Sequence, residues 1–245
     1  MGMADEERGK RRIMLLAVTG GVATGKSTVS RILEELGAPL IDFDVLARKV
    51  VEPGKPAWKE IVNYFGKGVL QDDGRIDRKM LSAVVFQDEA KRKRLESFTH
   101  PRIFEEFQRQ VEEVASGKPD AIVQAGIPLL IELNLQHRFD KVLLAYAPQE
   151  TQIDRLMKRD RVSREAATNV LKAQGPIDEK VRYADFVIRN DGPLEDTRKQ
   201  VEAVWQELKK MQKKNTENGI QNTGCRKQKA GNRRKETGDR GEKPG

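Results

Sequence analysis

A glycine-rich segment near the amino end combines residue types and spacing that bind nucleotide phosphates. Residues 20–27 read GGVATGKS, which fits the pattern GxxxxGK[ST]. Backbone N–H groups in such a loop wrap around phosphates, the lysine neutralises the β and γ phosphates, and the serine hydroxyl binds Mg²⁺. We therefore expect a site for ATP, with Mg²⁺ bound at Ser27 and with Lys26 in a catalytic role. The residues expected to hold the nucleotide are Gly20, Gly21, Val22, Ala23, Thr24, Gly25, Lys26, Ser27 and Thr28.

The residues on either side of this segment predict the strand and the helix that such a loop requires. Residues 13–18 (IMLLAV) form a continuous apolar run, which is typical of a strand buried on both faces. Residues 27–36 have apolar side chains at helical spacing, and Gly37 closes the pattern. The alternative is that the segment is only a glycine-rich turn. Such a turn would not require a lysine at this position, between a strand and a helix. We interpret the segment as a phosphate loop.

Two acidic residues follow a second short predicted strand at residues 39–41. Asp42 and Asp44 would lie at a strand end beside the phosphate loop, where ligands bind in doubly wound sheets. We expect Asp44 to accept the proton of an acceptor hydroxyl, as a catalytic base, and Asp42 to contact the substrate. The alternative for either acid is a cap for the helix that starts near Val45. Residues 121–125 end without the acid that GTPases and motor ATPases carry there, and this favours a kinase.

Arginines are frequent in the two helices predicted at residues 151–161 and 163–173. Arg155, Arg159, Arg161 and Arg164 could neutralise charge that develops on the transferred phosphoryl group, while a lid excludes water. Arg159 is our candidate for a catalytic role. The alternative is a solvated helix face on which the arginines pair with neighbouring acids.

The order of the predicted elements indicates the fold class. Apolar runs at residues 121–125, 141–146 and 186–188 add three strands, and helical patterns separate them. Such alternation predicts an α/β fold with a parallel sheet flanked by helices. We expect a kinase domain over residues 13–211, with a helical acceptor-binding region at about 45–117 and a lid at about 151–182. A last helix is expected from about Leu194 to Met211.

Composition separates this domain from its two ends. The chain has a net charge of +8, but residues 212–245 hold ten Lys or Arg against four Asp or Glu, so most of the excess lies there. We expect residues 1–12 to be a charged lead-in and residues 212–245 a disordered basic tail, which could touch nucleic acid without sequence preference. The one cysteine, Cys225, excludes an internal disulfide. With neither an export signal nor a long apolar segment, we expect a cytoplasmic protein without membrane contact.

Several short motifs, in order along the chain, resemble those of the dephospho-CoA kinase family. Residues 18–28 are similar to the phosphate loop of that family, and residues 42–48 (DFDVLAR) to its DxD…AR element. The resemblance runs over residues 16–192, which is most of the predicted domain. It continues through residues 50–54, 65–66, 73–74, 95–101 (LESFTHP), 128–132 (PLLIE), Arg159-Asp160, Gln174, Ala184-Asp185 and Asn190.

The resemblance implies an adenylate-kinase-like core that transfers phosphate from ATP to the ribose 3′-hydroxyl of dephospho-coenzyme A. It implies that Asp44 activates this hydroxyl and that Asn190 contacts the nucleotide. The candidate substrate-binding residues are Asp42, Arg48, His100 and Gln174. For His100, a place at a helix start before Pro101 is an alternative. The chain departs from the family at Ala23, where glycine is usual and the loop should be stiffer, and at Gly175-Pro176, near the lid hinge.

Two other functions fit parts of the sequence. One is a different small-molecule kinase that acts on a nucleoside monophosphate, shikimate or gluconate. Acceptors with a monophosphate favour basic residues early in the chain, whereas the second strand here ends in acids. The other is a P-loop protein that binds nucleic acid through the basic tail, which we regard as the weaker alternative.

Overall fold

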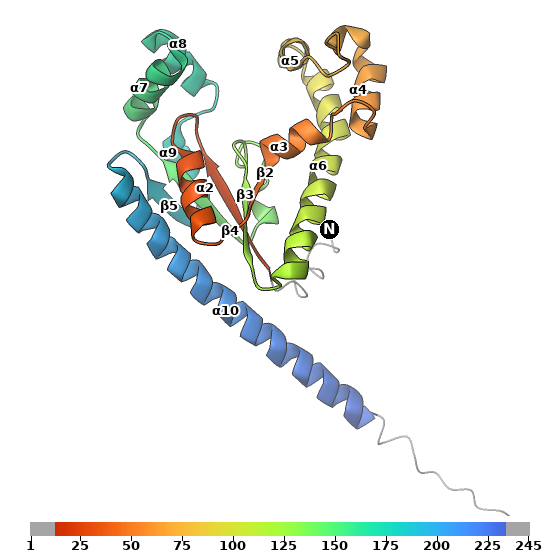
Figure 1. Ribbon diagram of the computed structural model, residues 1–245, viewed down its shortest axis with the longest axis vertical. Helices are drawn as coiled ribbons and strands as arrows, with labels where there is room; N and C mark the ends of the chain where they lie inside the picture. The colour runs from red at the N-terminus through yellow and green to blue at the C-terminus, as the bar shows by residue number, and fades with distance from the viewer. Residues whose placement is uncertain (1–12, 234–245) are drawn as a thin grey trace, which may run out of the picture.

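The computed structural model describes residues 13–233, in which a parallel sheet is flanked by helices (Figure 1). The strand order is β2-β3-β1-β4-β5, and every pair of neighbours is parallel. This confirms the expected α/β fold class with its parallel sheet. The strands are β1 (Met14–Gly20), β2 (Leu40–Asp42), β3 (Ile122–Gly126), β4 (Lys141–Tyr146) and β5 (Phe186–Arg189).

α-Helices connect these strands, except that β3 leads to β4 through turns and a 3₁₀ turn. Three short 3₁₀ turns, Lys67–Val69, Gln136–Arg138 and Val181–Tyr183, also occur. The α-helices are α2 (Lys26–Glu35), α3 (Phe43–Lys49), α4 (Pro56–Phe65), α5 (Arg78–Phe86), α6 (Glu89–Gly117), α7 (Gln149–Asp160), α8 (Arg164–Lys172), α9 (Ile177–Lys180) and α10 (Leu194–Arg233).

Alternate side chains of β1 belong to two separate hydrophobic cores, one on each face of the sheet. Leu15 and Ala17 pack with side chains of α3 and α6. Met14, Leu16 and Val18 point to the other face and pack with α2 and α10. Burying one such leucine contributes about 1.5–3 kcal/mol. The central strand is therefore held rigidly from both sides, and so is the loop that follows it.

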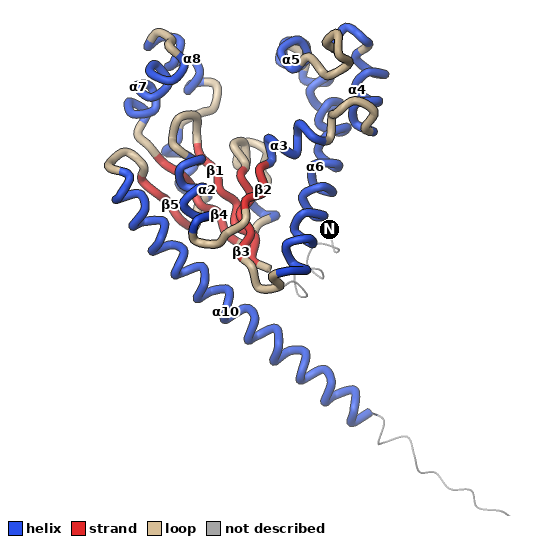
Figure 2. The backbone as a smooth tube through the Cα atoms, viewed as in Figure 1, coloured by secondary structure: helices blue, strands red, loops and turns tan. Residues whose placement is uncertain are grey.

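Two helical arms extend from the carboxyl-end edge of the sheet (Figure 2). The α4–α6 arm has its own small core, in which Ile61, Leu81 and Phe98 are buried. The α7–α8 arm has another, built on Ile153, Leu156 and Ala167, and Val22 of the phosphate loop packs against it. Residues 45–117 and 151–182, singled out from the sequence, thus lie on opposite sides of the loop.

The last helix extends further than the sequence predicted. α10 continues to Arg233, whereas we expected a helix end near residue 211 and disorder beyond it. Among the residues whose burial is described, Leu208 and Gln212 are the last buried ones, and Gln212 Nε2 donates to the Asp120 carbonyl oxygen at 3.4 Å. Local propensity did not indicate this continuation, because residues 213–233 include three glycines and four asparagines, which are poor helix formers.

The expectations for residues 1–12 and 234–245 lie outside the described residues. Within residues 13–233, no helix combines the length and the apolar character needed to cross a membrane.

Candidate active site

The phosphate loop connects β1 to α2, as its sequence predicted. Gly25, directly before α2, has a φ of 88°, a left-handed value that favours glycine. A Cβ built on Gly25 would lie 1.9 Å from Asn190 Nδ2, and one on Gly20 would lie 2.6 Å from Thr24 Oγ1. Both glycines are therefore required by close approach to a neighbouring group. Lys26 and Ser27 open α2, so their side chains lie at the helix end that attracts phosphate.

Asn190 and Arg155 brace this loop from behind. Asn190 is buried; its Nδ2 donates to the Thr24 carbonyl oxygen at 2.9 Å, and its Oδ1 accepts from Thr197 Oγ1 at 3.0 Å. Arg155 Nη1 donates to the Ala23 carbonyl oxygen at 3.2 Å, and Nη2 donates to the Asn190 carbonyl oxygen at 2.6 Å. Both side chains thus hold the backbone of the loop at Ala23 and Thr24. A loop that binds phosphate needs its N–H groups free, and these hydrogen bonds use carbonyl oxygens instead.

Gln174 also contacts the loop. Its Oε1 accepts a hydrogen bond from the Val22 N–H at 2.8 Å. Gln174, which we expected to bind the substrate, therefore contacts the phosphate loop from the end of the α7–α8 arm. The N–H groups of such a loop are donors to phosphate. In this structure the donor of Val22 is taken by the Gln174 side-chain oxygen, in the way that a phosphate oxygen would accept it.

Ala23 adopts a conformation that suits glycine better. Its φ is 58°, in the left-handed region, and its methyl group packs with Val22 against the α7–α8 arm. A non-glycine residue there costs about 1–2 kcal/mol. Ala23, which stands where the family usually has glycine, is therefore a strained residue.

Lys26 reaches along the sheet edge toward the end of β2, where Asp42 lies. A Cβ built on Gly126, the last residue of β3, would lie 3.3 Å from Lys26 Nζ and 3.9 Å from Asp42 Cα. Gly126 also pairs with Asp42 in the register of β2 and β3. The absence of a side chain at Gly126 leaves space for the ammonium group between the phosphate loop and the start of α3.

Asp42 and Asp44 have different environments. Asp42 caps α3: its Oδ1 accepts a hydrogen bond from the Asp44 N–H at 2.8 Å. The capping alternative considered from the sequence is therefore what the structure shows for Asp42. Asp44 lies in the first turn of α3 and is exposed, without an ion pair among the described residues. Its carboxylate remains available to a substrate.

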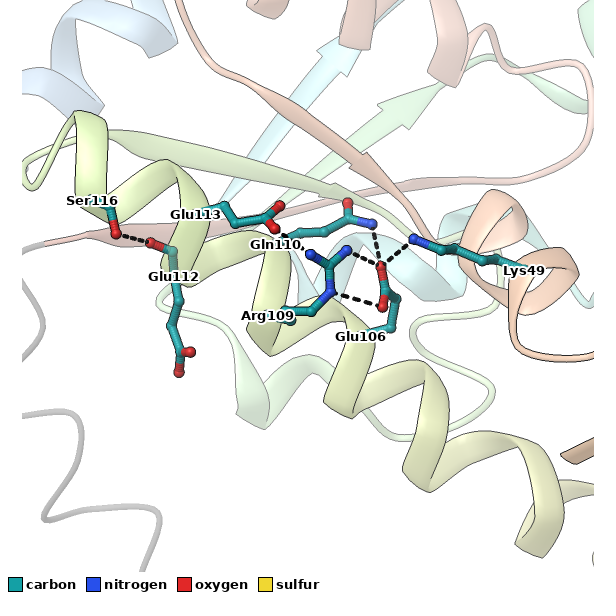
Figure 3. A network of polar contacts seen from close by, with 7 residues as sticks. All are labelled: Lys49, Glu106, Arg109, Gln110, Glu112, Glu113 and Ser116. Carbon is teal, nitrogen blue, oxygen red and sulfur yellow. Dashed lines mark hydrogen bonds and ion pairs between the residues drawn. The ribbon is translucent and has the colours of Figure 1, made fainter. Parts of the chain in front are cut away.

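The helix that carries Asp44 is anchored firmly to α6. Phe43 is buried among the rings of Phe104, Phe107 and Phe139, with centroids 5.1–6.4 Å away. At the other end of α3, Lys49 Nζ donates to Glu106 Oε1 at 2.8 Å (Figure 3). Aromatic packing of this kind is worth about 0.5–1.5 kcal/mol per pair beyond burial. Asp44 is thus held on a rigid element and not on a loop.

Glu106 is the centre of the network drawn in Figure 3. Its carboxylate accepts hydrogen bonds from Arg109, Lys49 and Gln110. The hydrogen bonds from Arg109, with those from Lys49 and Gln110, hold the pKa of Glu106 well below its ordinary value, although partial burial opposes them. Glu106 therefore stays charged at neutral pH and keeps α3 joined to α6.

The structure does not bring Arg159 to the phosphate loop. Its Nε and Nη2 donate to the Asp160 carboxylate at 2.7 and 2.8 Å, and Arg164 pairs with Glu150. Arg155, one turn earlier on the same helix, is the arginine that reaches the loop. The pairing of arginines with neighbouring acids, which we considered as the alternative, describes Arg159 and Arg164 in this structure.

The remaining candidates lie on the α4–α6 side. Arg48 is exposed on the last turn of α3, four residues after Asp44 and on the same face. His100 lies half-buried inside α6, so the alternative of a helix-start histidine is wrong, and the expected substrate contact stays a prediction. α6 passes through Pro101 without ending, since the helix is packed along its length by Phe98, Ile103 and Phe107.

Sequence reasoning missed the role of α9. Lys180, whose side chain is only 6% exposed, forms an ion pair with Glu132 at 2.5 Å. Tyr146 donates its hydroxyl hydrogen to Asp178 at 2.7 Å. These contacts fix the base of the α7–α8 arm to the ends of β3 and β4. Glu132 belongs to the motif at residues 128–132, but nothing local in the sequence indicates its partner.

Comparison with known proteins agrees with this geometry. The family model described as "Dephospho-CoA kinase" matches residues 14–196. The dephospho-CoA kinase of Syntrophus aciditrophicus is 45% identical over 206 residues, which cover 84% of this chain and 88% of that protein. The dephospho-CoA kinase of Bacillus anthracis is 46% identical over 191 residues, covering 78% and 95%.

A solved structure agrees as well. The dephospho-CoA kinase from Campylobacter jejuni has a TM-score of 0.61 and 34% identity, over 81% of this chain and 98% of that one. The match to the family model covers the phosphate loop, both aspartates, the two arms and Asn190. This chain therefore belongs to the dephospho-CoA kinase family.

Proposed function

We propose that this protein transfers the γ-phosphoryl group of ATP to the ribose 3′-hydroxyl of dephospho-coenzyme A, which yields coenzyme A. The observation that carries the proposal is the position of Asp44. It is an exposed carboxylate on the first turn of a rigid helix, which starts beside the strand end where Lys26 Nζ lies. An acceptor hydroxyl next to Asp44 would face a phosphoryl group held by the loop.

The reaction follows from these positions. The 3′-oxygen attacks the γ-phosphorus, a new P–O bond forms, and the bond to the leaving ADP oxygen breaks. Asp44 accepts the proton of the hydroxyl, a role typically worth about 10²–10⁴ in rate. Lys26 and the N–H groups of the loop neutralise charge on the phosphoryl oxygens. Asp42, which caps α3, fixes the backbone of Asp44 and contributes a second negative group nearby.

Mg²⁺ fits this site only together with the nucleotide. Within the described residues, no group of three or more His, Cys, Asp or Glu side chains could hold a metal by itself. Mg²⁺ usually takes few protein ligands and several oxygens from phosphate and water. The exposed hydroxyl of Ser27 on α2 is a suitable ligand, and the ion would add charge neutralisation between the β and γ phosphates.

The two arms receive separate roles in this proposal. The α4–α6 arm, with Arg48 and His100, binds the acceptor, and the α7–α8 arm serves as the lid. Asn190 and Gln174 act through the phosphate loop that they contact. Arg159 would have to leave Asp160 to reach a phosphoryl group, which lid closure could accomplish. A cytoplasmic location belongs to the same proposal.

A competition assay tests the acceptor. Purified protein with ATP and Mg²⁺ is offered dephospho-coenzyme A, shikimate, gluconate and adenosine 5′-monophosphate at equal concentrations, and each product is quantified. We expect coenzyme A as the dominant product. Preferential phosphorylation of one of the other acceptors would show that the substrate assignment is wrong.

The nucleic-acid alternative is tested by truncation. A chain that ends after Gln212, the last residue with a described packing contact, should retain full kinase turnover. If the full chain retains RNA at physiological salt and kinase turnover requires residues 213–245, the alternative would gain support. We expect at most salt-sensitive, non-specific retention by the full chain.

A further inference from the structure

Two arginines beside Asp44 lack the partners that other arginines of the same arm have. Arg48 lies on α3, and Arg78 is the first residue of α5. Arg78 Nη2 donates to the Ala47 carbonyl oxygen at 3.2 Å, so this guanidinium lies over the last turn of α3, next to Arg48. The two side chains thus come together from separate helices on the acceptor side of the sheet.

The rest of the α4–α6 arm shows how unusual this pair is. The other arginines of residues 43–117 each have a carboxylate or an aromatic ring as a partner: Arg75 with Asp73, Arg92 with Glu96, Arg94 with Tyr64 and Phe98, Arg102 with Glu60, and Arg109 with Glu106. Within residues 13–233, Arg48 and Arg78 have neither a described ion pair nor a described ring contact. Two positive groups without a described acidic partner therefore lie within electrostatic range of one another.

Their mutual effect appears in the acidity of Arg78. Partial burial lowers the pKa of its guanidinium below the ordinary value, and the positive charge of Arg48 lowers it further. The carboxylate of Asp44 acts in the opposite direction. The three groups are therefore within electrostatic range of one another, and the excess charge of the pair is positive. An anion placed between the two guanidiniums would relieve this repulsion.

The spacing along α3 indicates which anion fits. Asp44 and Arg48 are four residues apart, so they lie on one helix face, separated by about one turn or 5.4 Å. In a nucleotide acceptor, the ribose separates the 3′-hydroxyl from the 5′-phosphates. With the hydroxyl at Asp44, the 5′ side of the ribose can extend along α3 toward Arg48 and Arg78.

We propose that Arg48 and Arg78 together form a subsite for the diphosphate of the acceptor, with Arg78 as a specificity residue not marked by any of the sequence motifs. The proposal rests on the proposed function, since dephospho-coenzyme A carries a 5′-diphosphate next to its reactive ribose. The planar guanidinium groups match phosphate oxygens with paired N–H donors. They also offset the negative charge of Asp44, which alone would repel a diphosphate.

The test compares Arg78→Met with Lys79→Met. Lys79 is the next residue of α5 and is exposed, so its replacement removes the same charge without touching the pair. For each protein, three quantities are measured: kcat and KM for dephospho-coenzyme A at saturating ATP, KM for ATP, and the inhibition constant of adenosine against dephospho-coenzyme A. Adenosine has the ribose but no diphosphate. The midpoint of thermal unfolding is recorded as well, because Arg78 also binds the Ala47 carbonyl oxygen.

We expect Arg78→Met to raise KM for dephospho-coenzyme A about 10- to 100-fold, as for loss of a hydrogen bond between charged groups. KM for ATP and the inhibition constant of adenosine should change less than about threefold, and Lys79→Met should resemble the unchanged protein. Arg78→Lys should restore part of the affinity for dephospho-coenzyme A, because lysine keeps the positive charge but lacks the paired N–H donors of a guanidinium group.

Equal weakening of dephospho-coenzyme A and adenosine in Arg78→Met would overturn the subsite, because Arg78 would then act on the ribose side or on the shape of α3. An unchanged KM for dephospho-coenzyme A would overturn it too. The unchanged protein tests the function separately: failure to phosphorylate dephospho-coenzyme A would overturn the proposed function together with the subsite.

Discussion

The ion pair between Lys180 and Glu132 gives an asymmetric prediction for stability. Lys180 ends α9 and its side chain is 6% exposed, whereas the Glu132 side chain is 30% exposed. Glu132→Gln leaves a buried ammonium group without a carboxylate. Breaking a buried pair in this way costs about 3–5 kcal/mol, and we expect about 2–3 kcal/mol here because Glu132 is partly hydrated and glutamine still accepts a hydrogen bond.

The opposite substitution should cost much less. Lys180→Met keeps an apolar chain of similar length in the buried place, and the Glu132 carboxylate that remains can be hydrated. We expect a loss of about 1 kcal/mol or less. The double variant should resemble Lys180→Met, because with the ammonium group gone the second change removes no further interaction.

Thermal and urea unfolding measure these differences. For a chain of this length, 1 kcal/mol shifts the unfolding midpoint by about 2–4 °C, so Glu132→Gln should lower it by about 4–12 °C. Lys141→Met is the matched control, since the pair of Lys141 with Asp185 is 31% and 36% exposed and should contribute less than about 1 kcal/mol. If Lys180→Met proves as costly as Glu132→Gln, the argument from unequal burial is refuted.

Three further expectations concern the loop and α3. Ala23→Gly should raise the unfolding midpoint by about 1–3 °C with unchanged turnover, because φ at this residue is positive; a lower midpoint would show that the methyl contact is worth more than the strain. Asn190→Ala should cost about 2 kcal/mol in urea unfolding and raise KM for ATP, since it removes two buried hydrogen bonds behind the loop. An unchanged KM would indicate that the loop keeps its shape without this brace. The pKa of Glu106 is depressed in the folded state, so its contribution is present above the unfolded pKa of about 4.3 and is lost as pH falls below it. The stability advantage of the unchanged protein over Glu106→Gln should therefore shrink below about pH 4; a constant difference down to pH 3 would contradict this.

Much of the sheet and of the phosphate loop could be predicted because their signals are local. The apolar run before the loop, the glycines within it and the helical spacing after it all lie within 24 consecutive residues, 13–36. Strands covered on both faces need such runs, whatever the rest of the fold. The acids after β2 could be found in the same way, since strand ends beside the first loop form the ligand edge of this sheet class.

The contacts between distant segments could not be predicted. Arg155 and Arg159 lie on one helix, and their spacing alone does not indicate that Arg155 reaches the loop while Arg159 pairs with Asp160. Arg78 comes near Arg48 only because the fold brings the first residue of α5 to the Ala47 carbonyl oxygen on α3. Lys180 and Glu132 are separated by 48 residues and meet at the base of the α7–α8 arm. Each of these depends on how helices pack, which residue periodicity does not specify.

The measurement that tests the catalytic account most directly compares Asp44→Asn with Asp42→Asn in single-turnover phosphorylation of dephospho-coenzyme A. Asparagine is as good a helix cap as aspartate, so Asp42→Asn should keep α3 in place and lower the rate only a few-fold. Asp44→Asn should lower the rate by about 10²–10⁴, while the affinity for ATP, measured by direct titration, changes only a few-fold. Near-normal turnover by a folded Asp44→Asn protein, with an inactive Asp42→Asn protein, would contradict the assignment of Asp44 as the base.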